Sequence, residues 1–190
     1  MKKIAIFASG RGSNARKIIE HFEQDDEVDV RLIVSNKENA GVLNMGPEFV
    51  IPTKILNRKE FYDSEKLVKD LRAYEIDLIV LAGFLWLIPE YLVKNFRRKI
   101  INIHPALLPE YGGKGMYGMN VHHAVHTAKE NESGITIHFV NNEYDKGAVI
   151  FQKTCPISPT DSPQDIANKV LKLEHQYFPR VISKLLKENT

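Results

Sequence analysis

Two short segments, far apart in the chain, carry polar residues suited to moving a proton. Asn102 and His104 stand at the end of an apolar run, residues 100–105, that predicts a buried strand. Side chains alternate along a strand, so this carboxamide and this imidazole project from the same face. Asp145 stands in a polar turn that ends at Gly147, between two later strand candidates. If the fold joins these segments, an amide, an imidazole and a carboxylate share one cleft, a set suited to acyl transfer.

A glycine-rich segment, Gly10-Arg11-Gly12-Ser13-Asn14-Ala15, follows the first apolar run and opens a helical pattern. Backbone N–H groups and the helix dipole favour an anion at such a place. The spacing also fits a dinucleotide-binding pattern, but that pattern predicts an acidic residue about 20 residues further on, where this chain has Ser35-Asn36-Lys37. We therefore predict that Gly12, Ser13 and Asn14 hold a phosphate monoester. The alternative is a tight turn in which Ser13 or Asn14 caps the helix.

Two other features are candidates for the same cleft. The apolar run from Leu81 to Ile88 continues past a strand to the sheet edge where open parallel sheets bind ligands, and it would suit a flat aromatic ligand or serve as plain core. Glu174 lies on an otherwise apolar stripe of the last helical pattern. Burying an unpaired carboxylate is costly, so Glu174 should meet a ligand's hydroxyls or a cation, the latter as a structural salt bridge. The other members of this stripe are Ala167, Leu171, Phe178 and Ile182.

The remaining composition argues against several classes of function. His122 and His126 stand four apart, but no zinc-protease glutamate lies between them and no third ligand is evident, so we expect no metal. The 26 basic and 24 acidic residues are well mixed and leave a net charge of +2, which gives no reason to expect nucleic acid. The single cysteine, Cys155, allows no intrachain disulfide and is compatible with a reducing cytoplasm.

The distribution of apolar residues predicts a cytoplasmic protein without a membrane partner. No apolar run approaches the ~20 residues that span a bilayer. The chain begins with two lysines and an apolar run, as a secretory signal does, but this run stops at Ser9, too early for a secretory core.

Short apolar runs alternate with helical patterns, which favours a parallel sheet covered on both faces. With 190 residues and 43% hydrophobic residues, the chain can bury roughly 70% of its unfolded surface in one domain. The expected strands are 4–8, 28–34, 52–56, 78–82 and 100–103. The expected helices are 14–22, 39–45, 59–74, 89–96 and 121–129.

The last third of the chain has a different character. Residues 105–120 are rich in glycine and predict a mobile loop over a site. Residues 134–140 and 148–156, joined by a polar turn, predict an antiparallel pair at the sheet edge. Asp161-Ser162-Pro163 opens the final helix, and Pro179 should kink or split it. The expected fold is a single α/β domain with a Rossmann-like, doubly wound, mostly parallel sheet and an antiparallel edge.

Several of these segments, taken in order, resemble the motifs of the phosphoribosylglycinamide formyltransferase family, and the resemblance spans nearly the whole chain. The stretch that begins at Asn102 is shared with other formyltetrahydrofolate-using enzymes, whereas the glycine-rich start and the compact length select this family. The matching segments are Ser9-Gly10-Arg11-Gly12-Ser13-Asn14, Leu81-Ala82-Gly83-Phe84, Asn102-Ile103-His104-Pro105-Ala106-Leu107-Leu108-Pro109, Asp145-Lys146-Gly147 and Glu174-His175.

The resemblance implies a role for each of these segments. Gly12, Ser13 and Asn14 resemble the phosphate loop for a ribonucleotide, and Glu174 resembles the contact to its ribose. Lys59 occupies the place of an arginine that contacts the carboxylated tail of the folate. The loop from Gly112 to Asn120 departs from the family pattern, so its contacts are not carried over. The folate-pocket residues implied by the resemblance are Leu85, Trp86, Leu87, Ile88, Asn102, Asn141, Asn142, Glu143, Tyr144 and Asp145.

The resemblance also implies a reaction. The expected activity is transfer of the formyl group of the co-substrate 10-formyltetrahydrofolate to the amine of 5'-phosphoribosylglycinamide in purine biosynthesis. Protonated His104 and Asn102 would stabilise the oxyanion, and Asp145 would hold His104 and relay a proton. Residues 1–100 would form the ribonucleotide half of the domain, and residues 101–190 the catalytic and folate half. The alternatives are a formyltetrahydrofolate hydrolase and a non-catalytic phosphosugar-binding protein. We expect small-molecule substrates and a monomer or weak homodimer.

Overall fold

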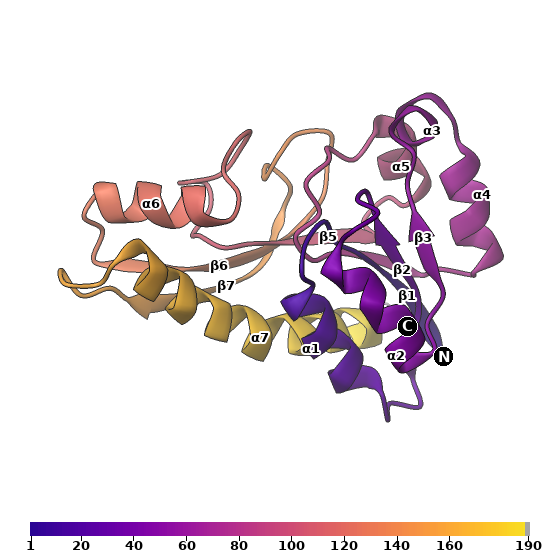
Figure 1. Cartoon of the computed structure of the whole chain (residues 1–190), viewed down its shortest axis with the longest axis horizontal. Coiled ribbons are helices and arrows are strands. Elements are labelled where there is room, and N and C mark those ends of the chain that lie inside the picture. Colours follow the sequence, from indigo (N-terminus) through magenta and orange to yellow (C-terminus); the bar gives the residue numbers. More distant parts are fainter. Residues whose placement is uncertain (189–190) are drawn as a thin grey trace.

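Hydrophobic strands that alternate with helices build one seven-stranded sheet in the computed structural model, which describes residues 1–188 (Figure 1). The strand order is β3-β2-β1-β4-β5-β6-β7; the first five strands are parallel, and β6 and β7 add an antiparallel edge. This arrangement confirms the predicted fold class. The strands are β1 (Lys2–Phe7), β2 (Val28–Ser35), β3 (Thr53–Ile55), β4 (Leu78–Leu81), β5 (Ile100–His104), β6 (Glu132–Phe139) and β7 (Val149–Pro156).

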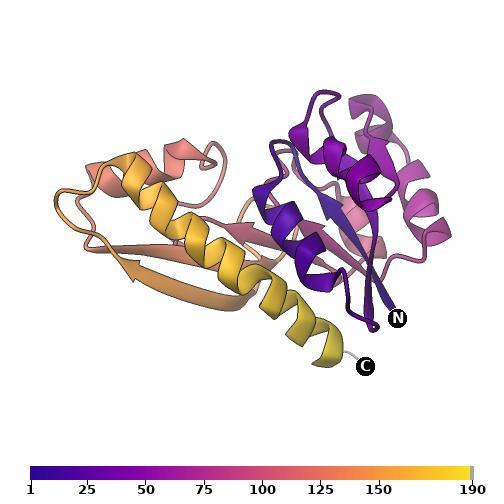
Figure 2. The same cartoon turned by 60° about the horizontal axis from the view of Figure 1, so that its bottom comes forward.

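Helices cover both faces of the sheet because the central strands are apolar on both sides. On β1, Ile6 packs into one core with Ile18 and Phe178, whereas its neighbour Phe7 packs into the other with Phe61. The first layer holds α1 (Ser13–Phe22), the 3-10 helix η1 (Gly41–Asn44), α2 (Met45–Phe49), α6 (Met119–Thr127) and α7 (Pro163–Glu188). The second holds α3 (Arg58–Asp63), α4 (Lys66–Ala73) and α5 (Glu90–Asn95). The long helix α7 runs beside β6 and reaches α1 (Figure 2).

The single helix predicted over residues 59–74 is wrong, because the chain forms the two helices α3 and α4. The side chain of Asn57 caps the start of α3 by accepting hydrogen bonds from two backbone N–H groups. Ser64 ends α3 in an extended conformation, donates its hydroxyl to the Glu60 carbonyl and accepts from the Lys66 N–H. Such local hydrogen bonds of serine compete with continuation of a helix. Phe61 on α3 and Leu71 on α4 are nevertheless buried in the same core.

Two expectations about the last helix also need correction. Pro179 does not split it, because α7 is continuous over 26 residues. An interior proline costs about 3 kcal/mol, but Pro179 and its neighbour Phe178 are buried, and packing on the core holds both halves of the helix. The buried stripe runs through Ile166, Val170 and Glu174, whereas Leu171, which we assigned to it, is 36% exposed.

Candidate active site

A cleft of about 650 Å³ lies at the carboxyl ends of β1, β4 and β5, where open α/β sheets bind ligands. Its walls also include the irregular loop after β5 and the turn between β6 and β7. Of the predicted site residues, Lys59 and Asn142 do not line it. Those that do are Gly12, Ser13, Asn14, Leu85, Trp86, Leu87, Ile88, Asn102, His104, Asn141, Glu143, Tyr144, Asp145 and Glu174.

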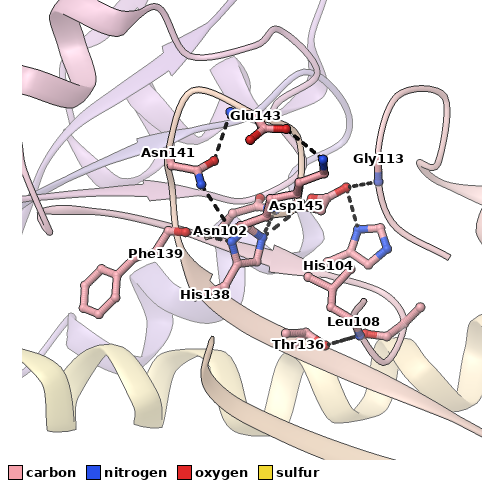
Figure 3. Close-up of polar contacts among 12 residues, drawn as sticks. Asn102, His104, Leu108, Gly113, Thr136, His138, Phe139, Asn141, Glu143 and Asp145 are labelled. Carbon is pink, nitrogen blue, oxygen red and sulfur yellow. Dashed lines mark hydrogen bonds and ion pairs between the residues drawn. The ribbon is translucent and has the colours of Figure 1, made fainter. Parts of the chain in front are cut away.

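The fold brings Asn102, His104 and Asp145 together in this cleft (Figure 3). Asn102 and His104 share one face of β5, as the alternation of strand side chains requires. The turn after β6 leads back to the sheet where β7 begins, and it lays Asp145 against both side chains. One Asp145 oxygen, Oδ2, lies 3.5 Å from His104 Nδ1, and the other, Oδ1, lies 3.4 Å from Asn102 Nδ2.

The backbone around Asp145 fixes the direction of its carboxylate. Asp145 has a left-handed conformation, with φ of 57°, which aspartate adopts more readily than most residues. The N–H of Gly113, in the loop after β5, donates to Asp145 Oδ2 over 2.9 Å. Burial alone would raise the pKa of Asp145, but its contacts with His138, His104 and the Gly113 N–H together lower it. The cleft therefore contains a buried carboxylate that is ionised at neutral pH.

His104 is 3% exposed and is held at both ring nitrogens. Its Nε2 lies 2.8 Å from the carbonyl of Tyr111, so Nε2 carries a hydrogen, and Nδ1 faces Asp145. Burial lowers the pKa of His104 below its ordinary value of 6.5, although Asp145 and the Tyr111 carbonyl oppose this shift. We expect a protonated His104 in the reaction; in the cleft without substrate, desolvation opposes the positive charge of the ring and the Asp145 carboxylate supports it.

His138 joins the same group, and the sequence analysis missed it. It lies on β6 directly opposite Asn102 and is 2% exposed. Its Nε2 is 3.1 Å from Asn102 Nδ2 and 3.6 Å from Asp145 Oδ1 (Figure 3). The available signal was a polar residue near the end of a predicted strand, but without the pairing of β5 with β6 nothing connected it to Asn102.

The glycine-rich segment forms the turn into α1 that its sequence predicts. Gly12 is the N-cap, with φ of 82°. A side chain there would be strained and its Cβ would lie 2.8 Å from Val42, so glycine is required. Within residues 1–188 no side chain caps this helix end, so neither Ser13 nor Asn14 takes the capping role of our alternative. The first N–H groups of an α-helix have no acceptor within the helix, so those of α1 can bind an anion, and Arg11 also lines the cleft.

Glu174 projects from α7 into the same end of the cleft and is 8% exposed. Its Oε2 accepts a hydrogen bond of 2.8 Å from Asn14 Nδ2, and Asn14 Oδ1 is buried without a partner in the described part of the chain. No cation of residues 1–188 forms an ion pair with Glu174, so the structural salt bridge that we considered does not form there. Burial raises the pKa of Glu174 from 4.5 to about 7, against the effect of Asn14. Both side chains therefore retain hydrogen-bonding capacity for a ligand.

The opposite end of the cleft is apolar and aromatic. Trp86 lines the cleft and packs against the ring of Phe61, 5.4 Å away. The guanidinium of Arg58 lies over the Trp86 ring at 5.2 Å, a cation–π contact. Lys59, which we expected near the tail of a ligand, is exposed, and neither Lys59 nor Arg58 lines the cleft itself; Arg58 reaches its wall through the contact with Trp86.

Two kinds of feature do not occur in the described part of the chain. Among residues 1–188 there is no group of three or more His, Cys, Asp or Glu side chains arranged to hold a metal ion. In the same residues, no helix has both the length and the apolar character needed to cross a bilayer.

Comparisons with known proteins agree on one family. The family model described as formyl transferase matches residues 2–182. A relative from Arabidopsis thaliana, "Phosphoribosylglycinamide formyltransferase, chloroplastic", is 42% identical over 98% of this chain, which spans 66% of that relative. A Bacillus subtilis protein with the name phosphoribosylglycinamide formyltransferase is 36% identical over 98% of this chain and 95% of its own length. The crystal structure of the phosphoribosylglycinamide formyltransferase from Anaplasma phagocytophilum superposes with a TM-score of 0.89 at 32% identity, covering 98% of this chain and 87% of that one.

Proposed function

Since the chain belongs to the formyl transferase family, we propose that it transfers the formyl group of 10-formyltetrahydrofolate to the amine of 5'-phosphoribosylglycinamide, a step of purine (IMP) biosynthesis. One observation carries this proposal. Asp145 lies within 3.5 Å of both Asn102 and His104, in a cleft that has a helix-opening turn at one end and an aromatic wall at the other.

The two ends of the cleft suit the two substrates. We assign the phosphate to Gly12, Ser13 and Asn14, because the start of a helix without a side-chain cap favours an anion. Glu174 would accept hydrogen bonds from the ribose hydroxyls. We assign the pterin ring to the wall from Leu85 to Ile88 and to residues 141–145. For the carboxylated tail of the folate we retain Lys59 as a proposed contact and add Arg58 as the nearer cation.

In the reaction, the substrate amine attacks the formyl carbon, the carbonyl electrons move to oxygen, and the bond to the folate nitrogen then breaks. Asn102 donates an N–H to the oxygen as its negative charge develops. The bare Nδ1 of neutral His104 accepts a proton as the attacking nitrogen becomes cationic, and the Asp145 carboxylate stabilises the imidazolium formed. His104 then returns this proton to the departing folate nitrogen, so the proton balance closes without a metal or a covalent enzyme intermediate.

The wider assignments follow the same proposal. Residues 1–100 would supply mainly the ribonucleotide side of the cleft, and residues 101–190 mainly the catalytic groups. Small molecules would be the substrates. A cytoplasmic location and a monomer or weak homodimer stay predictions; the name of the Arabidopsis relative includes the word chloroplastic.

The proposal is tested by following both products at once. Purified protein with both substrates should release one deformylated folate for each formylated ribonucleotide, and omission of the ribonucleotide should stop deformylation. Deformylation that continues without the ribonucleotide would indicate a hydrolase instead, and binding of the ribonucleotide without turnover would indicate a phosphosugar-binding protein.

One substitution tests the catalytic assignment. His104→Ala should lower kcat about 100- to 1,000-fold, the usual cost of removing one such group, with little change in the KM for the ribonucleotide. His123→Ala is the matched control, because His123 is exposed on α6 and does not line the cleft. Near-normal kcat in His104→Ala would contradict the role of His104.

A further inference from the structure

His138 is buried at the centre of the cleft, yet the reaction above gives it no part. Its 2% exposure and its place opposite Asn102 on the neighbouring strand keep it within the catalytic group. The ionisable side chains that face it are Asp145, from the turn after β6, and His104, from the end of β5. A buried imidazole in such a place needs partners for both ring nitrogens, and these partners define what it does.

The protonation pattern of the His138 ring follows from its hydrogen bonds. Nδ1 lies 2.8 Å from the carbonyl oxygen of Phe139, and a carbonyl can only accept, so Nδ1 carries a hydrogen. In the neutral ring Nε2 is then a bare acceptor. Asn102 Nδ2 lies 3.1 Å from this Nε2 and donates to it (Figure 3).

The same amide nitrogen of Asn102 has a second hydrogen, and the distances to the two acceptors distinguish the two hydrogens. The bond to His138 is the shorter one, at 3.1 Å, whereas the distance to Asp145 Oδ1 is 3.4 Å. The shorter bond anchors the plane of the carboxamide. The second hydrogen, loosely held by Asp145, is the one that can be redirected to an oxygen in the cleft.

We propose that His138 is a positioning residue that orients the Asn102 carboxamide by accepting one of its hydrogens, so that the other is available to the formyl oxygen. This inference rests on the proposed formyl transfer and gives His138 no contact with the reacting atoms. Without an acceptor at Nε2, the Asn102 amide is no longer held in one orientation. It can then rotate so that its own oxygen faces the developing oxyanion, and the two oxygens would repel each other.

A first test measures which ring nitrogen of His138 carries the hydrogen, and it does not depend on enzyme activity. In protein labelled with nitrogen-15 at histidine, the His138 resonances should show a protonated Nδ1 and a bare Nε2 at neutral pH. In Asn102→Ala the Nε2 resonance should shift, because its hydrogen-bond donor is gone. A hydrogen on Nε2, or no response to Asn102→Ala, would overturn the proposal. If wild-type protein shows no formyl transfer, the proposed function fails, while this measurement still tests the contact.

A second test uses paired substitutions. His138→Leu removes the acceptor and should lower kcat about 100-fold, the scale expected when a catalytic group is misplaced, with an unchanged KM for the ribonucleotide. His138→Gln places an amide oxygen near the position of Nε2 and should recover most of kcat. Ile137→Val, on the opposite face of the same strand and fully buried, controls for general destabilisation. Equal losses of kcat in His138→Gln and His138→Leu would show that the acceptor is irrelevant.

The double variant shows whether His138 acts through Asn102. If it does, adding His138→Leu to Asn102→Ala should lower kcat only a few-fold further, because the anchored group is already absent. A further loss as large as that in the wild-type background would mean that His138 acts independently of Asn102, and the proposal would be wrong.

Discussion

Glu174→Gln should change how the stability of this protein depends on pH. In the folded chain this carboxyl is 8% exposed with Asn14 as its hydrogen-bond donor, and its pKa rises from 4.5 to about 7. The folded protein therefore binds this proton more tightly than the unfolded chain does. The contribution of this group to the free energy of unfolding is fully present below about pH 4.5. It is lost as the pH rises to about 7, because the buried carboxyl must then ionise.

The size of the effect follows from the same shift. A tenfold change in proton affinity is worth about 1.4 kcal/mol, so the rise from 4.5 to about 7 corresponds to about 3 kcal/mol. Glutamine keeps an oxygen that can accept from Asn14 and has no charge to bury. Glu174→Gln should therefore match the wild-type protein near pH 4.5 and exceed its free energy of unfolding by about 3 kcal/mol at about pH 8.

The measurement is urea denaturation of both proteins at several values from about pH 5 to about pH 8. Glu38→Gln serves as the control, because Glu38 is exposed and its curve should run parallel to that of the wild-type protein. A difference between wild type and Glu174→Gln that stays constant over this range would refute the reasoning, since it would mean that the carboxyl titrates alike in the folded and unfolded states.

Two further substitutions test how the site is held in place. In Gly147→Ala the new Cβ would lie 1.6 Å from the Phe139 carbonyl oxygen, so the turn must shift. The substitution should lower the free energy of unfolding by about 1–3 kcal/mol, the usual cost of overpacking, and should lower kcat because Asp145 moves. An unchanged kcat would show that the turn adapts. Asn57→Ala should cost about 0.5–2 kcal/mol through loss of the cap of α3, measured as a lower Tm with kcat unchanged.

The sequence predicted the doubly wound sheet because buried strands appear as short continuous apolar runs, whereas helices have apolar residues at helical spacing. It also predicted that Asn102 and His104 share a face, since alternation along a strand is a local property. Features that depend on local side-chain hydrogen bonds or on long-range packing were harder to predict. Ser64 ends a helix through its own hydroxyl, and Pro179 is tolerated because buried neighbours hold α7 on both sides.

The residues of the cleft also include some that the sequence could predict and some that it could not. The residue types that line it could be found from motifs. The cations near its aromatic wall could not, because neither Lys59 nor Arg58 lines the cleft and only the contact of Arg58 with the Trp86 ring connects a cation to that wall. His138 escaped notice because its relation to Asn102 exists only through the antiparallel register of β5 and β6. Register is a long-range property, and no spacing within the chain encodes it.

The protonation of the catalytic group depends on backbone atoms rather than on residue types. The Tyr111 carbonyl holds the hydrogen of His104 on Nε2, the Phe139 carbonyl holds that of His138 on Nδ1, and the Gly113 N–H supports the charge of Asp145. Each of these backbone groups lies in a loop or at the end of a strand, where the sequence could not predict the direction of the backbone N–H or carbonyl. A motif can therefore identify the imidazoles, but the fold decides which nitrogen of each ring carries the hydrogen.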